Sequence, residues 1–291
     1  MSRTLEVLTK IYKPYRITKV NNCLIMKTME GDYVVKEKID VNYRELYNYL
    51  LSRSFSFFPK IVSDEREDVV VFEYVEDVCL DKEQKALDLI KLVALLHSKT
   101  TYFKEVTKDK YKEIYDNLRG NIGYIQDVYD KRFNQYILEE YNLPSHYLFL
   151  RNYSLILNAC RYSLDKLDSW YDMVKENTKQ RVCLVHNNLS LEHYLKNEDD
   201  YLISWDKYII DTPVMDLYKF YRNEWDNTQF SILFETYDKE HGLLDDEKIL
   251  LDIMISIPFL VEEEGNEYNN CRGYRKLINY LGKSSKVIFN D

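Results

Sequence analysis

Two short apolar segments in the second half of the chain, residues 182–185 and 201–203, are each followed by polar loops. These loops gather histidine, amide and carboxylate side chains, the residue types that orient hydroxyl groups, move protons and bind cations: His186, Asn188, His193, Asp206 and Asp216. Because rigid strands hold the loops that follow them in place, the pattern favours a polar cleft. A hairpin whose polar side chains only cap turns is the alternative, and spacing alone leaves both interpretations open.

Several other classes of site are excluded by their missing motifs. The sequence contains no P-loop, no Gly-x-Ser-x-Gly elbow, no dinucleotide fingerprint and no zinc-ligand spacing. Its five cysteines are dispersed, with no two at Cys-x-x-Cys spacing, which favours a reducing compartment over a disulfide framework. We therefore expect a cytoplasmic protein.

The charge balance limits the class of partner. The 291 residues include 40 Lys and Arg against 49 Asp and Glu, a net charge of −9, which argues against nucleic acid. The longest apolar stretch, residues 249–261, contains Asp252 and Pro258 and is too short to span a membrane. Charged residues near Met1 interrupt any apolar run, so no signal peptide is expected. A protein or a small molecule remains as the expected partner.

The residues before the polar segment must position it, and the first 77 predict an antiparallel sheet with one helix. A hairpin is expected over residues 22–37, with its turn at residues 30–32 and Lys36 near the end of its second strand. Residues 42–51 predict a helix, because apolar residues recur at helical spacing. Two further strands are expected over residues 58–62 and 68–75.

Residues 78–291 predict mainly helices. Helical periodicity covers residues 82–98, 111–141 and 147–177, with Pro144 in a break between the last two. The polar segment at residues 184–206 follows, and helices return to the C-terminus. The sequence thus predicts an α+β protein of two lobes, a small β-rich N-lobe (1–77) and a larger, mainly helical C-lobe (78–291).

The order of these motifs resembles a known family, the aminoglycoside-phosphotransferase and choline-kinase branch of the protein kinase-like superfamily. The catalytic loop of that family reads His, any residue, Asp, four residues, Asn, and the same frame here holds His186, Asn188 and His193. Its metal-binding strand resembles Ile203-Ser204-Trp205-Asp206. The run Asp211-Thr-Pro-Val-Met-Asp216-Leu217 is similar to the spore-coat kinase-like members of the family.

The resemblance also implies roles for residues upstream. Lys36 corresponds to the lysine that contacts nucleotide phosphate, and Glu45 to its ion-pair partner on the next helix. Phe72-Glu73-Tyr74-Val75 resembles the hinge, which assigns Glu73 and Val75 to nucleotide binding. His186 is implied as a loop anchor and Asp216 as a structural acceptor. The alternative that Lys36 is an ordinary surface lysine at the end of a strand stays open.

The departures from the family pattern concern the residues that perform chemistry. Asn188 stands at the catalytic aspartate, and an amide cannot accept a proton at neutral pH. His193 stands at the metal-binding asparagine and Ser204 at the metal-binding aspartate, although imidazole suits Mg²⁺ poorly. Asp206 lies two residues beyond Ser204 and, if the strand continues, faces the same side, so it could bind a shifted metal together with His193. Only one glycine, Gly31, lies in the N-lobe, so no glycine-rich phosphate loop is present.

These substitutions lead to two main functional hypotheses, and an enzyme that uses the nucleotide cleft for another group transfer is a third. The first is a catalytically degenerate, pseudokinase-type binding or scaffold protein, with a role in spore-coat or envelope assembly implied by the resemblance. The second is an active small-molecule phosphotransferase with unconventional metal ligation through Asp206. No cofactor is certain, and ATP and Mg²⁺ are expected only if the cleft is open. The acidic run at residues 262–264 is interpreted as a solvated face.

Overall fold

The computed structural model describes residues 2–38, 41–64, 66 and 68–289. Its N-terminal part is built on a five-stranded antiparallel sheet in the order β1-β2-β3-β5-β4. The strands are β1 (Arg16–Val20), β2 (Cys23–Lys27), β3 (Asp32–Glu37), β4 (Ile61–Ser63) and β5 (Val69–Glu73). The predicted hairpin is confirmed as β2–β3, and its turn contains Gly31 at φ 149°, in a region that favours glycine.

The two faces of this sheet are covered by different elements, as the period-two alternation of β5 requires. Val69 and Val71 pack with Leu8 of α1 (Ser2–Tyr12), while Val70 and Phe72 belong to the main core with α2 (Tyr43–Ser52). The prediction of a single helix here is wrong, because α1 and β1 were not expected. Helix α1 carries Leu5, Leu8 and Tyr12 at helical spacing, so an amphipathic signal is present in the sequence and was missed.

Helix α2 is confirmed with its boundary set by a side-chain cap. The Asn42 side chain accepts a hydrogen bond from the backbone N–H of Glu45 at 3.2 Å, which satisfies a free donor of the first turn. The buried face of the helix carries Tyr43, Leu46, Tyr47 and Leu50. Glu45 lies on the exposed face.

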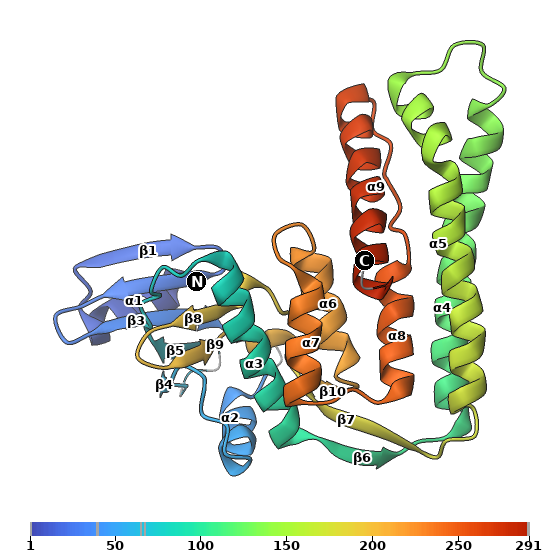
Figure 1. Cartoon of the computed structure of the whole chain (residues 1–291). Helices are drawn as coiled ribbons and strands as arrows, with labels where there is room; N and C mark the ends of the chain where they lie inside the picture. Colours follow the sequence, from blue (N-terminus) through green and yellow to red (C-terminus); the bar gives the residue numbers. More distant parts are fainter. Residues whose placement is uncertain (1, 39–40, 65, 67, 290–291) are drawn as a thin grey trace.

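The helical part contains two long helices that form an arm, α4 (Lys108–Tyr136) and α5 (Pro144–Val174), beside α9 (Figure 1). Both long helices were predicted, but Pro144 is the first residue of α5 instead of lying in a break, a position that needs no backbone N–H. The other helices are α3 (Lys82–Thr100), α6 (Val214–Glu224), α7 (Phe230–Glu240), α8 (Asp245–Ser256) and α9 (Glu267–Phe289). One continuous core joins them to α2 and the N-terminal sheet.

Two small sheets hold the polar segment. Strands β6 (Tyr102–Glu105), β7 (Lys179–Val185) and β10 (Ile209–Asp211) form one, in the order β10-β7-β6. Strands β8 (Tyr194–Lys196) and β9 (Asp200–Leu202) form a hairpin that bonds back to the N-terminal part. Leu202 N donates to Phe57 O at 2.9 Å, and Val78 N donates to Lys196 O at 2.7 Å.

The predicted α+β class, with a small antiparallel sheet followed by a larger helical part, is confirmed. The expected join near residue 77 falls between β5 and α3, and the division into two domains stays a prediction. Within the ranges that the structure describes, no helix combines the length and the apolar character needed to cross a bilayer.

A partly buried carboxylate in α8 gives a first prediction. Burial raises the pKa of Asp252 to about 6, and Lys166 only partly offsets this effect. The pKa of Asp252 is thus higher in the folded than in the unfolded protein. Its contribution to the free energy of unfolding is therefore fully present below the unfolded-state pKa, where the carboxyl is protonated, and is lost as the pH rises through about 6. We expect Asp252→Asn to gain stability relative to wild type between pH 4 and pH 7, by roughly 1–3 kcal/mol. Urea unfolding at both pH values measures this, and a pH-independent difference contradicts it.

Candidate functional site

Asp216, in the first turn of α6, is the fully buried acceptor around which the polar loop is organised. Its carboxylate accepts the backbone N–H groups of His186 at 2.7 Å and Asn187 at 2.6 Å. The His97 ring of α3 donates through Nε2 at 3.0 Å, and its Nδ1 faces the Tyr237 hydroxyl of α7 at 2.7 Å. A buried charge is tolerated when hydrogen bonds replace its hydration, and three donors do so here.

His186 is a neutral anchor in this arrangement. Burial lowers the pKa of its imidazole to about 4, although the charge of Asp216 acts in the opposite direction. Its Nε2 donates to the carbonyl of Ile203 at 2.7 Å, and the ring packs edge-on against Trp205 at 5.0 Å. Its Nδ1 has no hydrogen-bond partner among the described residues. The hydrogen bond to Ile203 joins the loop after β7 to the loop after β9.

The His193 ring, at the family's metal position, is turned toward its own loop and meets the backbone of Asn188 there. Asn187 has φ 61°, in the left-handed region, so the chain reverses just before Asn188. The His193 ring donates from Nδ1 to the carbonyl of Asn188 at 2.5 Å. That bond leaves Nε2 of His193 as the nitrogen without a proton in the neutral ring.

Asp206 reaches the cleft by a route that differs from the expected one. The strand prediction is wrong here, because β9 ends at Leu202 and Ser204 has φ 65°, so strand alternation does not relate Ser204 to Asp206. The buried Trp205 donates its indole N–H to Leu202 O at 2.8 Å and fixes the following 3₁₀ turn. This turn carries Asp206 to the side of the N-terminal sheet.

There Asp206 joins two residues of the N-terminal part in what we call the cross-lobe cluster: Lys36, Tyr43 and Asp206. Lys36 Nζ donates to one carboxylate oxygen and the Tyr43 hydroxyl to the other. Burial acts to raise the pKa of Asp206, but these hydrogen bonds and the Lys36 charge outweigh it and hold the pKa below its usual value. Burial and the bond to Asp206 raise the pKa of Tyr43. Asp206 is therefore an ionised, largely enclosed partner of the lysine.

The predicted pair between Lys36 and Glu45 is wrong. Within the described part of the chain, the ion-pair partner of Lys36 is Asp206. In a helix of 3.6 residues per turn, Glu45 lies about 200° around the axis from Tyr43, which faces Lys36. Glu45 instead lines an open groove of about 470 Å³ beside β6 and β10, together with Tyr49, Arg53, Tyr102, Tyr208 and Ile210.

The proposed hinge residues lie at the end of β5. The Glu73 carboxylate accepts the backbone N–H of Lys60 at 2.9 Å, and Tyr74 N donates to Asp32 O at 3.0 Å. Val75 is buried. These contacts tie the segment to β3 and to the chain leading into β4, and its role toward a nucleotide stays a prediction.

The donor set does not fit a conventional Mg²⁺ site. Of the residues described, no three His, Cys, Asp or Glu side chains gather as metal ligands. Both oxygens of Asp206 are hydrogen-bonded, one of them to a cation, and His193 Nδ1 is bonded to its own loop. Mg²⁺ requires several oxygen ligands in an octahedral arrangement. The pair Asp206 and His193 is insufficient as it stands.

No protein-family model matches the sequence, and no curated protein matches it significantly. Solved structures match its backbone. An aminoglycoside phosphotransferase from Alicyclobacillus acidocaldarius is 12% identical, with a TM-score of 0.66 over 95% of this chain and 92% of its own. Spectinomycin phosphotransferase in complex with ADP and spectinomycin is 13% identical, with a TM-score of 0.56 over 98% of both chains. Choline kinase from Streptococcus pneumoniae is 17% identical, with a TM-score of 0.50 over 99% of both.

The chain has the kinase-like fold of these phosphotransferases. The resemblance implied by the motifs is confirmed at this level, and the spore-coat branch stays a prediction. Within this kinase-like fold, the polar segment brings His186, Asn188 and His193 together, and Asp206 meets Lys36 across the lobes. Sequence reasoning missed Tyr43, because a tyrosine at an apolar helix position gives no sign of a polar role.

The role of Asp216 gives a second prediction. In Asp216→Asn an amide NH₂ must face at least one donor, which leaves a buried N–H unpaired. We expect a loss of about 2–4 kcal/mol in the free energy of unfolding, measured by urea denaturation. The control is Asp211→Asn, whose carboxylate accepts the backbone N–H of Thr212 and is less buried. Equal losses in the two variants would contradict the assignment.

The cross-lobe cluster gives a third prediction. Asp206→Asn removes the ion pair with Lys36 and should lower stability at pH 7 by about 1–3 kcal/mol. The folded-state pKa of Asp206 is depressed, so its contribution is present above the unfolded pKa near 4 and is lost as the pH falls further. The difference from wild type should therefore shrink in acid. Tyr43→Phe retains the ion pair and should cost less, and a larger loss than in Asp206→Asn contradicts this ranking.

Proposed function

We propose that the protein is a catalytically degenerate, pseudokinase-type binding or scaffold module. The observation that carries this proposal is the cross-lobe cluster, in which the lysine expected to contact phosphate and the carboxylate expected to bind metal are bonded to each other. Tyr43 takes the second carboxylate oxygen. A nucleotide would have to break these bonds before either residue could serve it.

The substituted positions add to this argument. Asn188 cannot act as the general base, a function that contributes about 10²–10⁴-fold to rates. Ser204 supplies a hydroxyl where a carboxylate would balance the charge of Mg²⁺. His186 and Asp216, which keep the loop in shape, remain in place. The residues that hold the loop in shape are thus retained, while the residues that would perform phosphoryl transfer are replaced.

An active small-molecule phosphotransferase is the second candidate, and one observation favours it. Asp206 is ionised and 23% of its side chain is exposed, next to a lysine with 14% exposed. Exchange of partners, with Lys36 moving to phosphate and Asp206 to a metal, would restore part of a kinase site. Neighbours of the same fold include a spectinomycin phosphotransferase and a choline kinase.

The expected setting follows from the charge and from the resemblance. A net charge of −9 disfavours nucleic acid, so we expect a protein partner or a small molecule. The dispersed cysteines fit a cytoplasmic location. Spore association and a role in spore-coat or envelope assembly rest on the resemblance alone.

A nucleotide titration decides between the two candidates. We expect the thermal midpoint to stay unchanged with millimolar ATP, with or without Mg²⁺ or Mn²⁺, because a ligand that does not bind the native state cannot stabilise it. A metal-dependent rise that is abolished by Asp206→Ala and kept in Asp199→Ala would support the phosphotransferase instead.

If ATP leaves the thermal midpoint of wild type unchanged, a variant with the family residues restored shows whether the substituted positions are the cause. The triple change Asn188→Asp, His193→Asn and Ser204→Asp returns the family residues, and aspartate tolerates the left-handed conformation of Ser204. We expect this variant to gain a metal-dependent shift that wild type lacks, because the carboxylate restored at residue 204 offers the cation a ligand that is not bonded to Lys36. Equal responses of the two proteins would show that the substituted residues do not control nucleotide binding.

A further inference from the structure

The connection between α4 and α5, residues 137–143, stands at the free end of the helical arm, far from the cross-lobe cluster (Figure 1). Five apolar or aromatic side chains here are at least half exposed: Ile137 57%, Leu138 85%, Tyr141 85%, Leu143 50% and Tyr147 63%. Single exposed apolar residues are ordinary, but a contiguous set marks an interaction surface.

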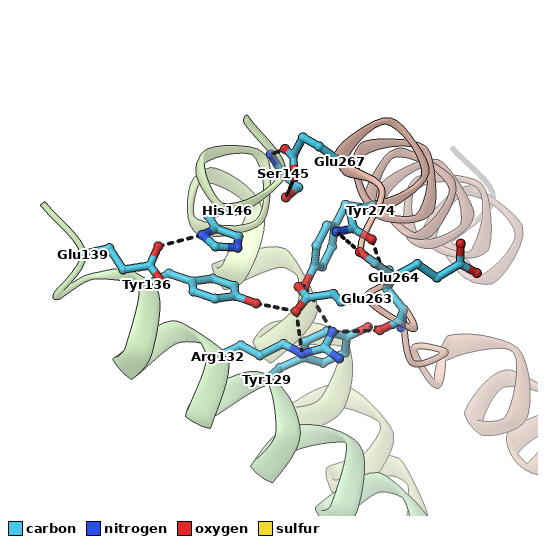
Figure 2. Close-up of polar contacts among 12 residues, drawn as sticks. Tyr129, Arg132, Tyr136, Glu139, Ser145, His146, Glu263, Glu264, Glu267 and Tyr274 are labelled. Atoms are coloured by element: carbon cyan, nitrogen blue, oxygen red, sulfur yellow. Dashed lines mark hydrogen bonds and ion pairs between the residues drawn. The ribbon is translucent and has the colours of Figure 1, made fainter. Parts of the chain in front are cut away.

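The connection is tied down at both ends (Figure 2). The rings of Tyr136 and His146 stack at 3.7 Å with an angle of 6° between them. His146 Nδ1 lies 2.7 Å from the Glu139 carboxylate, and the Tyr136 hydroxyl donates to Glu263 at 2.5 Å. The exposed side chains are therefore presented by an ordered segment, which lowers the entropic cost of binding.

A second segment lies against the first. Glu267, at the start of α9, accepts the backbone N–H of Ser145 at 2.5 Å and its hydroxyl at 2.8 Å (Figure 2). The next residue, Tyr268, is 75% exposed. We define the tip patch as Ile137, Leu138, Tyr141, Leu143, Tyr147 and Tyr268.

The surroundings of the tip patch are acidic. Residues 137–147 contain two glutamates and residues 262–268 contain four, and neither segment contains Lys or Arg. The glutamates at residues 262–264 are all exposed, as the sequence predicted, but Glu263 also pairs with Arg132 at 3.9 Å and accepts the hydroxyls of Tyr136 and Tyr274. Glu140 is exposed as well.

The nearest exposed basic residues lie further along the helices. Lys131 is six residues from Ile137, but Arg151 and Arg272 follow Tyr147 and Tyr268 by four residues, a helical spacing that makes them neighbours of these two patch residues. Arg132 is occupied by Glu263, by Val261 O at 2.8 Å and by the Tyr274 hydroxyl at 3.1 Å. Around the patch, the exposed carboxylates at residues 140, 262, 263 and 264 outnumber Arg151 and Arg272.

We propose that the tip patch binds an amphipathic segment of a protein partner that carries apolar residues on one face and Lys or Arg beside them. Apolar side chains would cover the patch, and basic ones would pair with Glu140 and the exposed glutamates at residues 262 and 264. An anionic lipid surface would be repelled by these carboxylates, and a second copy would bring the same charges. The inference rests on the proposed binding function and supplies the chemistry of its partner.

The test uses a fluorescent, synthetic amphipathic helix of leucine and lysine, with a leucine–glutamate peptide of the same pattern as its counterpart. Fluorescence anisotropy should show binding of the lysine peptide only. The double variant Leu138→Ser, Tyr141→Ser should weaken it about tenfold or more, since exposed anchors dominate such interfaces. Glu140→Lys with Glu262→Lys should weaken it and reduce its salt dependence. The control Met29→Ser, 92% exposed on the β2–β3 turn, should leave it unchanged.

Three outcomes overturn the proposal. The first is that the lysine peptide binds equally to wild type and to the tip variants. The second is that phosphatidylcholine vesicles bind instead of the peptide and that the tip variants weaken this vesicle binding. The third is that sedimentation shows a dimer that the tip variants abolish. Because the substituted side chains are exposed, we expect the tip variants to stay folded, and unchanged thermal midpoints check that weaker binding does not come from unfolding. If the protein transferred phosphate from ATP and still bound the lysine peptide, the proposed function would be wrong and the proposed binding site at the tip would still hold.

Discussion

The burial of one carboxylate, that of Asp216, constrains most of the site. With no exposed surface, it must be satisfied by donors from the protein, and it takes them from the backbone of residues 186 and 187 and from the His97 ring. Two successive backbone N–H groups can point at one carboxylate only if the chain turns there, and Asn187 at φ 61° makes that turn. Because His97 also meets Tyr237, the same charge fixes α3, α6 and α7 around the end of β7.

The cross-lobe cluster depends on this frame. His186, held by Asp216, bonds the carbonyl of Ile203 and so fixes the chain just before it enters the left-handed conformation at Ser204. From there the 3₁₀ turn brings Asp206 to Lys36. None of the frame contacts involves Asn188 or the Ser204 side chain. The frame can therefore persist when the chemical groups change, which accounts for a backbone that matches phosphotransferases at 12–17% identity.

The sequence predicted the elements whose signals are local, and it failed where tertiary contacts decide. The β2–β3 hairpin, α2 and the two long helices follow from turn residues and periodicity. The Glu45 error was avoidable, because the apolar positions of α2 already placed Glu45 on the opposite face. The left-handed Ser204 was not predictable, since serine has no preference for that conformation and tertiary contacts hold it, from His186 to Ile203 O and from Trp205 to Leu202 O. The contacts of Glu263 were not predictable either, because its partner Tyr136 is 127 residues away in sequence.

Rigidity connects the cross-lobe cluster with the tip patch. Phosphotransferases that enclose their substrates depend on motion between parts of the cleft. Here the N-terminal part is bonded to the β8–β9 hairpin through Phe57 and Asp77, and Lys36 and Tyr43 are bonded to Asp206. Such ties oppose opening, but they suit a body that presents an ordered surface, because a preformed site loses less entropy on binding. In the proposed scaffold function the cleft therefore contributes by staying closed, and recognition falls to the distant end of the arm.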